Sequence, residues 1–241
     1  MSAVLYSVES GVATATLNRP ESRNALNLAM CDGLLAAAQS AAADESVKLF
    51  LVRANGPVFC AGADLKERQG MSEQDVRARR MKGFAAYEAI ESLPMPAVAV
   101  VAGPAVGSGC EIAGACDFIV ATPAASFRTP EAVRGTVGAT QRLPRVLGKR
   151  LAKDMMFTGR TLGAEEALRH GFVTRLVEVD ALEAAVAEVV KSIIAAPRAT
   201  LAAAKCVIDR GVELDPAGAL QAEIDAIEAQ LASGTWMGKT S

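Results

Sequence analysis

Two glutamates, Glu111 and Glu131, stand twenty positions apart in segments that contain few other charged residues. Glu111 lies in the run of small and apolar residues 107–116, which follows the apolar run 97–102, and Glu131 follows Pro130. A carboxyl group in apolar surroundings loses hydration, which raises its pKa toward the range useful for proton transfer. Two such groups are what the addition of water to a double bond, or its removal, requires. This pair indicates an enzyme.

A glycine-rich stretch, residues 103–109, joins an apolar run to a short segment that we expect to be helical. A dinucleotide-binding fingerprint would need a third glycine at the position of Ile112, and no G-x-x-x-x-G-K-S/T motif occurs. Two other interpretations stay open. One is an anion site at a helix N-terminus, where free N–H groups favour negative charge, and the other is tight packing.

A second loop of small residues, 59–67, again opens an expected helix. Small side chains let a backbone approach a ligand closely, although such a segment is most often a plain loop. Two loops that each present a backbone N–H could form an oxyanion hole. Such a hole would stabilise an enolate that develops on a thioester oxygen.

Composition restricts the other classes of function. The 241 residues are 51% hydrophobic but only 4% aromatic, so alanine, valine and leucine must fill most of the core. A net charge of −2 argues against general nucleic-acid binding. The five cysteines are scattered through apolar segments, so we expect reduced thiols of an intracellular protein, and no Cys/His cluster suggests zinc.

The single histidine, His170, stands before Gly171 at the end of an expected helix. There it is best explained as a cation favoured by the helix C-terminus, so carboxylates must carry most of the acid–base chemistry. The first ten residues lack the pattern of a signal peptide, and no apolar run approaches the ~20 residues of a membrane span. We expect a soluble, cytoplasmic protein without membrane contact.

Strand and helix signals alternate in the first half of the chain. Residues 4–8 and 12–17 predict a hairpin, and the runs 47–52, 97–102 and 118–121 predict buried strands. Helices are expected at 25–43, 72–92 and 109–116. This alternation predicts an α/β fold with largely parallel pairing.

The second half is expected to be mostly helical. Helices are predicted at 143–157, 164–170, 181–195, 199–210 and 216–231, with one strand at 173–179. We divide the chain into a core, residues 1–195, and a helical C-terminal region, residues 196–241, which would cap the core or supply a subunit contact.

A basic cluster on the helix at 72–92 contains Arg77, Arg79, Arg80 and Lys82. The plainest interpretation is a solvated face. A phosphate contact is an alternative, and RNA binding is a weaker one because no aromatic residues alternate with these charges for base stacking.

Taken together, these segments resemble the enoyl-CoA hydratase/isomerase (crotonase) family, in the same order and over most of the chain. The similar segments are Leu17-Asn18-Arg19-Pro20, Asn24-Ala25-Leu26-Asn27, residues 59–67, residues 102–117, residues 140–145 and Thr158-Gly159-Arg160. Their combination is highly specific, whereas no single segment would be.

The resemblance implies a crotonase-like α/β spiral of ββα units with a helical C-terminal region, assembled as homotrimers or dimers of trimers. It implies an enoyl-CoA hydratase of lipid and fatty acid metabolism, with acyl-CoA as substrate and no metal or other cofactor. The backbone N–H groups of Ala63 and Ser108 would form the oxyanion hole, and Glu111 and Glu131 would be the catalytic acid–base pair. The substrate-binding positions would be Ala61, Ala63, Asp64, Leu65, Lys66 and Ser108.

Three features depart from the family pattern. Ser108 stands where the family usually has glycine, and the segment 135–139 is about three residues shorter than the family's turn. The chain also ends at 235–241 without the usual basic, aromatic segment that helps to hold CoA. The shorter turn keeps an isomerase, or another reaction of CoA thioesters, as the alternative to a hydratase, and an RNA- or partner-binding protein is the third hypothesis.

Overall fold

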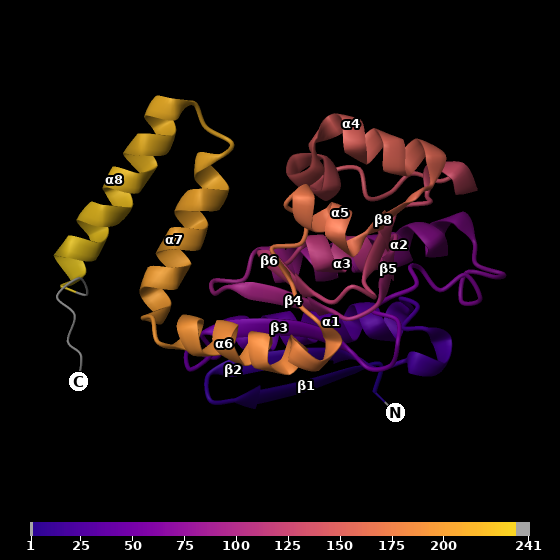
Figure 1. The fold of residues 1–241 in the computed structure, drawn as a ribbon, viewed down its shortest axis with the longest axis horizontal. Helices are drawn as coiled ribbons and strands as arrows, with labels where there is room; N and C mark the ends of the chain where they lie inside the picture. Colours follow the sequence, from indigo (N-terminus) through magenta and orange to yellow (C-terminus); the bar gives the residue numbers. More distant parts are fainter. Residues whose placement is uncertain (1, 235–241) are drawn as a thin grey trace.

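In the computed structural model, which describes residues 2–234, a six-stranded sheet runs through the centre of the core (Figure 1). Its strand order is β1-β2-β3-β4-β6-β9. The strands are β1 (Val4–Glu9), β2 (Val12–Leu17), β3 (Leu49–Ala54), β4 (Ala97–Val101), β6 (Phe118–Ala121) and β9 (Arg175–Leu176). Only β1 and β2 pair antiparallel, as the predicted hairpin, and the other neighbours pair in parallel.

The parallel strands are buried on both faces. Along β3, Phe50 and Val52 join the larger core with α1 and α2, whereas Leu49 and Leu51 pack with α6 on the opposite face. Because successive side chains point to opposite faces, a strand covered on both sides must be apolar throughout. This explains why the continuous apolar runs of the sequence predicted these strands well.

Eight α-helices complete the part of the chain that the structure describes. They are α1 (Leu28–Ala43), α2 (Glu73–Glu91), α3 (Ser108–Gly114), α4 (Arg142–Thr158), α5 (Ala164–Arg169), α6 (Leu182–Ile194), α7 (Arg198–Gly211) and α8 (Pro216–Ser233). The predicted helix ends are confirmed where the sequence contains strong capping residues. Ser72 and Asp75 form a capping box at the start of α2, and Gly171, with φ of 76°, follows the end of α5 beside His170.

A second, three-stranded sheet has no counterpart in the sequence-based expectation. It consists of β5 (Pro104–Val106), β7 (Ser126–Arg128) and β8 (Thr161–Gly163). β5 pairs in parallel with β7, and β7 pairs antiparallel with β8. Strands of three residues are too short to show a period of two, so their sequences give no usable signal. This small sheet carries both glutamate-bearing segments.

The helix expected at 72–92 is confirmed as α2, which turns at residues 65–70 separate from the loop 59–67. Two other expectations were wrong in detail. The strand expected at 173–179 is limited to Arg175–Leu176. The helix expected at 143–157 contains a break at Gly148, whose φ of 74° interrupts α4.

The helices α7 and α8 form an antiparallel pair that projects from the rest of the molecule (Figure 1). Polar contacts connect α7 to the core: Arg198 donates to the carbonyls of Val47 and Ala42 at 2.9 and 3.2 Å, and Lys205 forms an ion pair with Asp117 at 3.0 Å. The division into 1–195 and 196–241 stays a prediction. Residues 235–241, on which the expectation of altered CoA binding rests, lie outside the described residues.

Candidate active site

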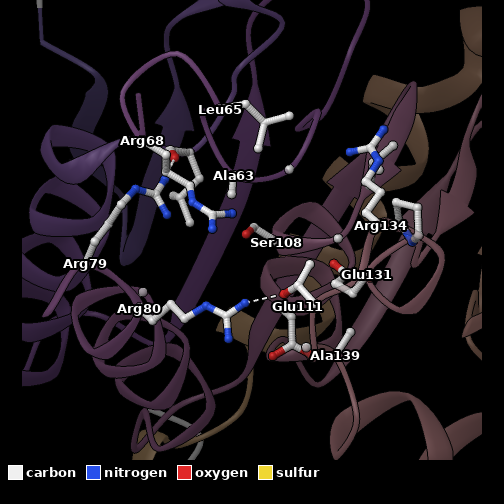
Figure 2. A pocket seen from close by; sticks show the side chains of 18 of the residues that line it. Ala63, Leu65, Arg68, Arg79, Arg80, Ser108, Glu111, Glu131, Arg134 and Ala139 are labelled. Atoms are coloured by element: carbon white, nitrogen blue, oxygen red, sulfur yellow. Dashed lines mark hydrogen bonds between the residues drawn. The ribbon is translucent and has the colours of Figure 1, made fainter. Parts of the chain in front are cut away.

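A cavity of about 120 Å³ lies between the loop 61–68, α2, the start of α3 and the segment 130–139 (Figure 2). The structure brings six of the predicted site residues to its lining: Ala61, Ala63, Leu65, Ser108, Glu111 and Glu131. These residues come from three separate parts of the sequence. Their common position results from the way β5 and β7 pair.

One side of the cavity is held by backbone-to-backbone packing. The loop at Cys60 lies beside β5, where the Val106 N–H donates to the Cys60 carbonyl at 2.8 Å and the Cys60 N–H donates to Pro104 at 3.2 Å. A Cβ on Gly109 would lie 2.5 Å from the same Cys60 carbonyl, and one on Gly103 would overlap the Pro57 carbonyl. The glycine-rich stretch is therefore explained at these two positions by tight packing.

This packing presents two free N–H groups. Neither Ala63 nor Ser108 donates its backbone N–H to an acceptor within residues 2–234. Ser108 is the first residue of α3, where N–H groups have no partner in the helix. Gly62 has φ of 93°, and a Cβ there would lie 3.0 Å from the Val106 carbonyl, so the loop at Ala63 fits against β5 only with glycine.

Glu111 projects from the first turn of α3 and is buried. Its Oε2 accepts a hydrogen bond from Arg142 Nη1 at 3.2 Å, whereas its Oε1 has no partner in the described part of the chain. Burial raises the pKa of Glu111, Arg142 opposes this rise, and the charge of Glu131 adds to it. Glu111 thus pairs with Arg142 through Oε2, and its Oε1 is available to another group.

Glu131 lies just before the 3-10 turn η2 (Ala132–Arg134) and is half-buried. Its Oε2 has no hydrogen-bond partner among the residues described, and its Oε1 lies so close to Gly107 that a Cβ there would overlap it. Burial raises the pKa of Glu131, and the charges of Arg134 and Arg80 oppose the rise. Both predicted carboxyls therefore have a raised pKa and an unpaired oxygen at one cavity.

Arg142, the first residue of α4, connects Glu111 to its surroundings. Its guanidinium also pairs with Glu91 at 2.5 Å and stands 5.8 Å from the ring centre of Tyr87. Burial raises the pKa of Tyr87, and a hydrogen bond with the Ser108 side chain opposes that rise. In the sequence, Arg142 was recognised only as part of the segment 140–145 that resembles the family, and no role was assigned to it.

The segment after Glu131 is held by a few hydrogen bonds. The Arg134 and Thr136 N–H groups both donate to the Glu131 carbonyl, at 3.1 and 2.9 Å. Val137 is 72% exposed, and Ala139 has φ of 54°, a conformation that non-glycine residues rarely adopt. This segment is the shortened turn noted in the sequence.

Two predicted substrate-binding residues do not line the cavity. The Asp64 carboxylate pairs with Arg19 at 3.0 Å and accepts from the N–H groups of Lys66 and Glu67 at 3.0 and 3.2 Å. Asp64 thereby holds the loop that follows Ala63. The Lys66 side chain is exposed.

The basic cluster of α2 does not form a solvated face, which corrects the expectation for Arg79 and Arg80. Arg79 is buried, pairs with Glu67 at 2.8 Å and donates to the Leu26 carbonyl. Arg80 lines the cavity, and Lys82 pairs with Asp32 at 2.7 Å. Of the four residues, Arg77 and Lys82 are exposed, so no continuous basic surface for RNA results.

Within residues 2–234, no group of three His, Cys, Asp or Glu side chains is placed to hold a metal ion. His170 does not line the cavity. No helix in the described range is long and apolar enough to cross a membrane.

The chain is similar to known proteins over most of its length. Residues 7–236 match the family model for enoyl-CoA hydratase/isomerase. The chain is 36% identical to a probable mitochondrial enoyl-CoA hydratase 2 of Arabidopsis thaliana over 89% of this chain and 73% of that protein. The predicted cytoplasmic location stays a prediction beside this mitochondrial relative.

Two solved structures extend the similarity to the fold. An enoyl-CoA hydratase from Bacillus anthracis superposes with a TM-score of 0.92 at 33% identity, over 95% of this chain and 91% of that chain. A putative enoyl-CoA hydratase from Thermobifida fusca in complex with acetoacetyl-CoA gives a TM-score of 0.88 at 26% identity, over 96% of both chains. The expected crotonase-like α/β fold is confirmed by these neighbours.

Proposed function

Since the chain belongs to the enoyl-CoA hydratase/isomerase family and is an enzyme of this kind, we propose that it adds water across the 2,3 double bond of an enoyl-CoA thioester. One observation carries the proposal: Glu111 and Glu131 each bring an unpaired carboxyl oxygen to the cavity that Ala63 and Ser108 also line. A cavity that contains polar groups and has this volume has room for a water molecule beside a thioester carbon.

In the proposed reaction, the thioester carbonyl oxygen accepts hydrogen bonds from the Ala63 and Ser108 N–H groups. Water is held between the two carboxyl groups. As its oxygen forms a bond to C3, one carboxylate takes its proton and the π electrons move toward the carbonyl oxygen. The resulting enolate is stabilised by the two N–H donors, and the other carboxyl group delivers a proton to C2. Overall, the reaction adds one water molecule and removes the C2–C3 double bond.

This chemistry needs no metal ion or separate cofactor, because CoA arrives with the substrate. The CoA part would lie along the loop 61–66, with the exposed Lys66 available to a phosphate group. The acetoacetyl-CoA complex of the Thermobifida fusca relative supports an acyl-CoA substrate.

The test measures hydration of crotonyl-CoA by the purified chain, through the loss of the enoyl thioester. Glu111→Gln and Glu131→Gln should each lower kcat/KM by about 10²–10⁴, the usual contribution of a general acid or base. Glu165→Gln, an exposed carboxylate on α5, is the matched control and should match the wild type. Full activity in either glutamate variant would exclude the two-carboxylate mechanism.

An isomerase is the second candidate, favoured by the short turn at 135–139. It would convert 3-enoyl-CoA to 2-enoyl-CoA and would depend mainly on one carboxylate. Assaying 3-enoyl-CoA beside crotonyl-CoA separates the two reactions.

We further propose that the protein forms homotrimers or dimers of trimers through α7 and α8. These helices carry exposed apolar side chains, among them Ile208 (65% exposed), Val212 (77%) and Leu220 (57%). A groove of about 660 Å³ lies between the two helices. Apolar patches of this kind mark interaction sites. Light scattering should give a trimer or hexamer mass, and Val212→Asp should lower it.

A further inference from the structure

Arg80 has a charge without a counter-charge. Its side chain reaches from α2 toward the space beside Ser108 and Glu111 (Figure 2) and is half-buried. The one hydrogen bond of its guanidinium goes to the Thr136 hydroxyl. No carboxylate within residues 2–234 forms an ion pair with it. A guanidinium has five N–H donors, so most of its donors are left for another group.

Two other arginines, Arg68 and Arg134, also line this cavity without an ion pair among the described residues, whereas the remaining neighbouring guanidinium groups are paired. Arg79 pairs with Glu67 at 2.8 Å, Arg142 with Glu91 and Glu111 at 2.5 and 3.2 Å, and Arg145 with Glu213 at 3.2 Å. A charge removed from water is costly unless it is paired. Of the acidic side chains that line a cavity together with Arg80, Glu91 and Glu111 pair with Arg142, Glu131 is assigned to the reaction, and Glu88 is exposed to solvent.

Arg80 also lies where the acyl chain must pass. A second, more open cavity of about 690 Å³ adjoins the first. The two cavities share six lining residues: Arg80, Phe84, Glu111, Val137, Gly138 and Ala139. A thioester carbonyl at Ala63 and Ser108, with C2 and C3 at the glutamates, directs the rest of the acyl group toward these shared residues.

The second cavity is polar as well as large. Besides Phe84 and Val137, its lining includes the polar residues Thr140 and Gln141, the cations Arg142 and Arg145, and the carboxylates Glu88 and Glu91. A site for a plain hydrocarbon chain is expected to be mainly apolar, with few polar groups. A guanidinium that points into the acyl path matches a planar carboxylate, which it can bind through two parallel hydrogen bonds.

We propose that Arg80 binds a carboxylate at the far end of the acyl group, so that the preferred substrates are CoA thioesters of unsaturated dicarboxylic acids. The proposal rests on the proposed function for the position of the thioester. It assigns Arg80 to specificity and leaves the proton transfers with Glu111 and Glu131.

The test measures binding with saturated thioesters, which cannot be hydrated. Affinities of butyryl-CoA, glutaryl-CoA, adipyl-CoA and free CoA are measured by calorimetry. The wild type should bind glutaryl-CoA or adipyl-CoA at least about tenfold tighter than butyryl-CoA, since a hydrogen-bonded charge pair adds to the affinity. Arg80→Gln should remove this preference, Arg80→Lys should keep part of it, and Arg77→Gln, an exposed arginine of the same helix, should not change it.

Two results would overturn the proposal. If butyryl-CoA binds the wild type as tightly as both dicarboxylic thioesters, no acyl carboxylate is recognised. If Arg80→Gln weakens free CoA and all thioesters equally, Arg80 contacts a phosphate of CoA instead. Because these measurements need no turnover, they decide the role of Arg80 even if crotonyl-CoA is not hydrated. Conversely, if the wild type hydrates crotonyl-CoA but does not prefer dicarboxylic thioesters, the proposed function holds and the proposal for Arg80 fails.

Discussion

The side of the cavity that carries Ser108 and Glu111 is made of regular elements packed backbone against backbone, whereas the side that carries Glu131 is a 3-10 turn and a short loop. We call residues 60–63 with 104–111 the packed wall and residues 129–141 the loop wall. In the packed wall, glycines such as Gly109 bring one backbone against another. In the loop wall, hydrogen bonds to the Glu131 carbonyl fix the turn, and side chains such as Val137 are exposed.

The difference separates two tasks. An oxyanion hole must hold its donors at fixed positions before the reaction, which close packing achieves. The residues that meet the rest of the acyl group can vary without moving those donors when they lie on a loop or on a helix surface. Arg80 and Arg134, which weaken the rise of the Glu131 pKa, lie on α2 and on the loop wall. The oxyanion donors and Glu111 would therefore reside in the packed wall and Glu131 in the loop wall, whereas Arg80 on α2 would determine which acyl groups are accepted.

The largest expected effect tests whether the two walls act together. If Glu111 and Glu131 hold one water, the double variant Glu111→Gln/Glu131→Gln should be no more than about tenfold slower than the slower single variant, since groups that act as a unit are not additive. Crotonyl-CoA turnover of the three variants checks this. A double variant whose loss equals the product of the single losses would mean that the carboxyls act in separate steps.

Matched glycine substitutions should distinguish the walls by stability. Gly109→Ala places a Cβ 2.5 Å from a backbone carbonyl, so we expect a loss of about 1–3 kcal/mol in the free energy of unfolding. Gly138→Ala places a Cβ 3.1 Å from the Glu131 Cγ, which a side-chain rotation can relieve, and should lower kcat more than stability. Denaturant unfolding and turnover are measured on both. Equal losses of stability would contradict the distinction between the walls.

The sequence predicted the strands of the central sheet better than the walls of the cavity, for a physical reason. Buried parallel strands need continuous apolar residues, so β3, β4 and β6 were visible as runs. Glu111 and Glu131 were recognisable because charge is rare in their segments. The three-residue strands β5, β7 and β8 were missed because their backbones depend on tertiary pairing, which leaves no local pattern.

The sequence pattern could not predict the position of the Arg80 side chain. Within the run 77–82 its charge looked like part of a solvated face, and helical spacing alone could not say which arginine turns inward. Arg79 and Arg80 are adjacent and both line the cavity, yet Arg79 pairs with Glu67 whereas Arg80 has no ion pair within residues 2–234. The loop 65–70, which positions Glu67 beside Arg79, determines that difference.

A smaller effect should appear in the pH dependence of stability. Burial raises the pKa of Glu131 above its ordinary value of 4.5, so the folded protein binds more protons than the unfolded chain in the window above pH 4.5. Wild-type stability is therefore lost as the pH rises through this window. Glu131→Gln lacks this loss, so its Tm should rise relative to the wild type by about 2–4 °C, the shift that ~1 kcal/mol produces in a domain of this size.

Thermal unfolding at several pH values between 4 and 7 checks this expectation. Glu111→Gln should gain less, because it gives up the ion pair with Arg142. A Tm difference for Glu131→Gln that does not change with pH would show that burial of its charge does not cost stability.

The smallest expected effect concerns Ser108, where the packed wall departs from the family's usual glycine. Its backbone N–H is the proposed oxyanion donor, whereas its side chain forms a hydrogen bond with Tyr87. Ser108→Gly keeps the N–H and widens the cavity, so we expect less than about 1 kcal/mol of lost stability and less than about tenfold loss of crotonyl-CoA turnover. Ser108→Ala separates the hydroxyl from the Cβ. A loss as large as that of the glutamate variants would mean that the hydroxyl itself takes part in the reaction, and the packed wall would then act through a side chain as well as through its backbone.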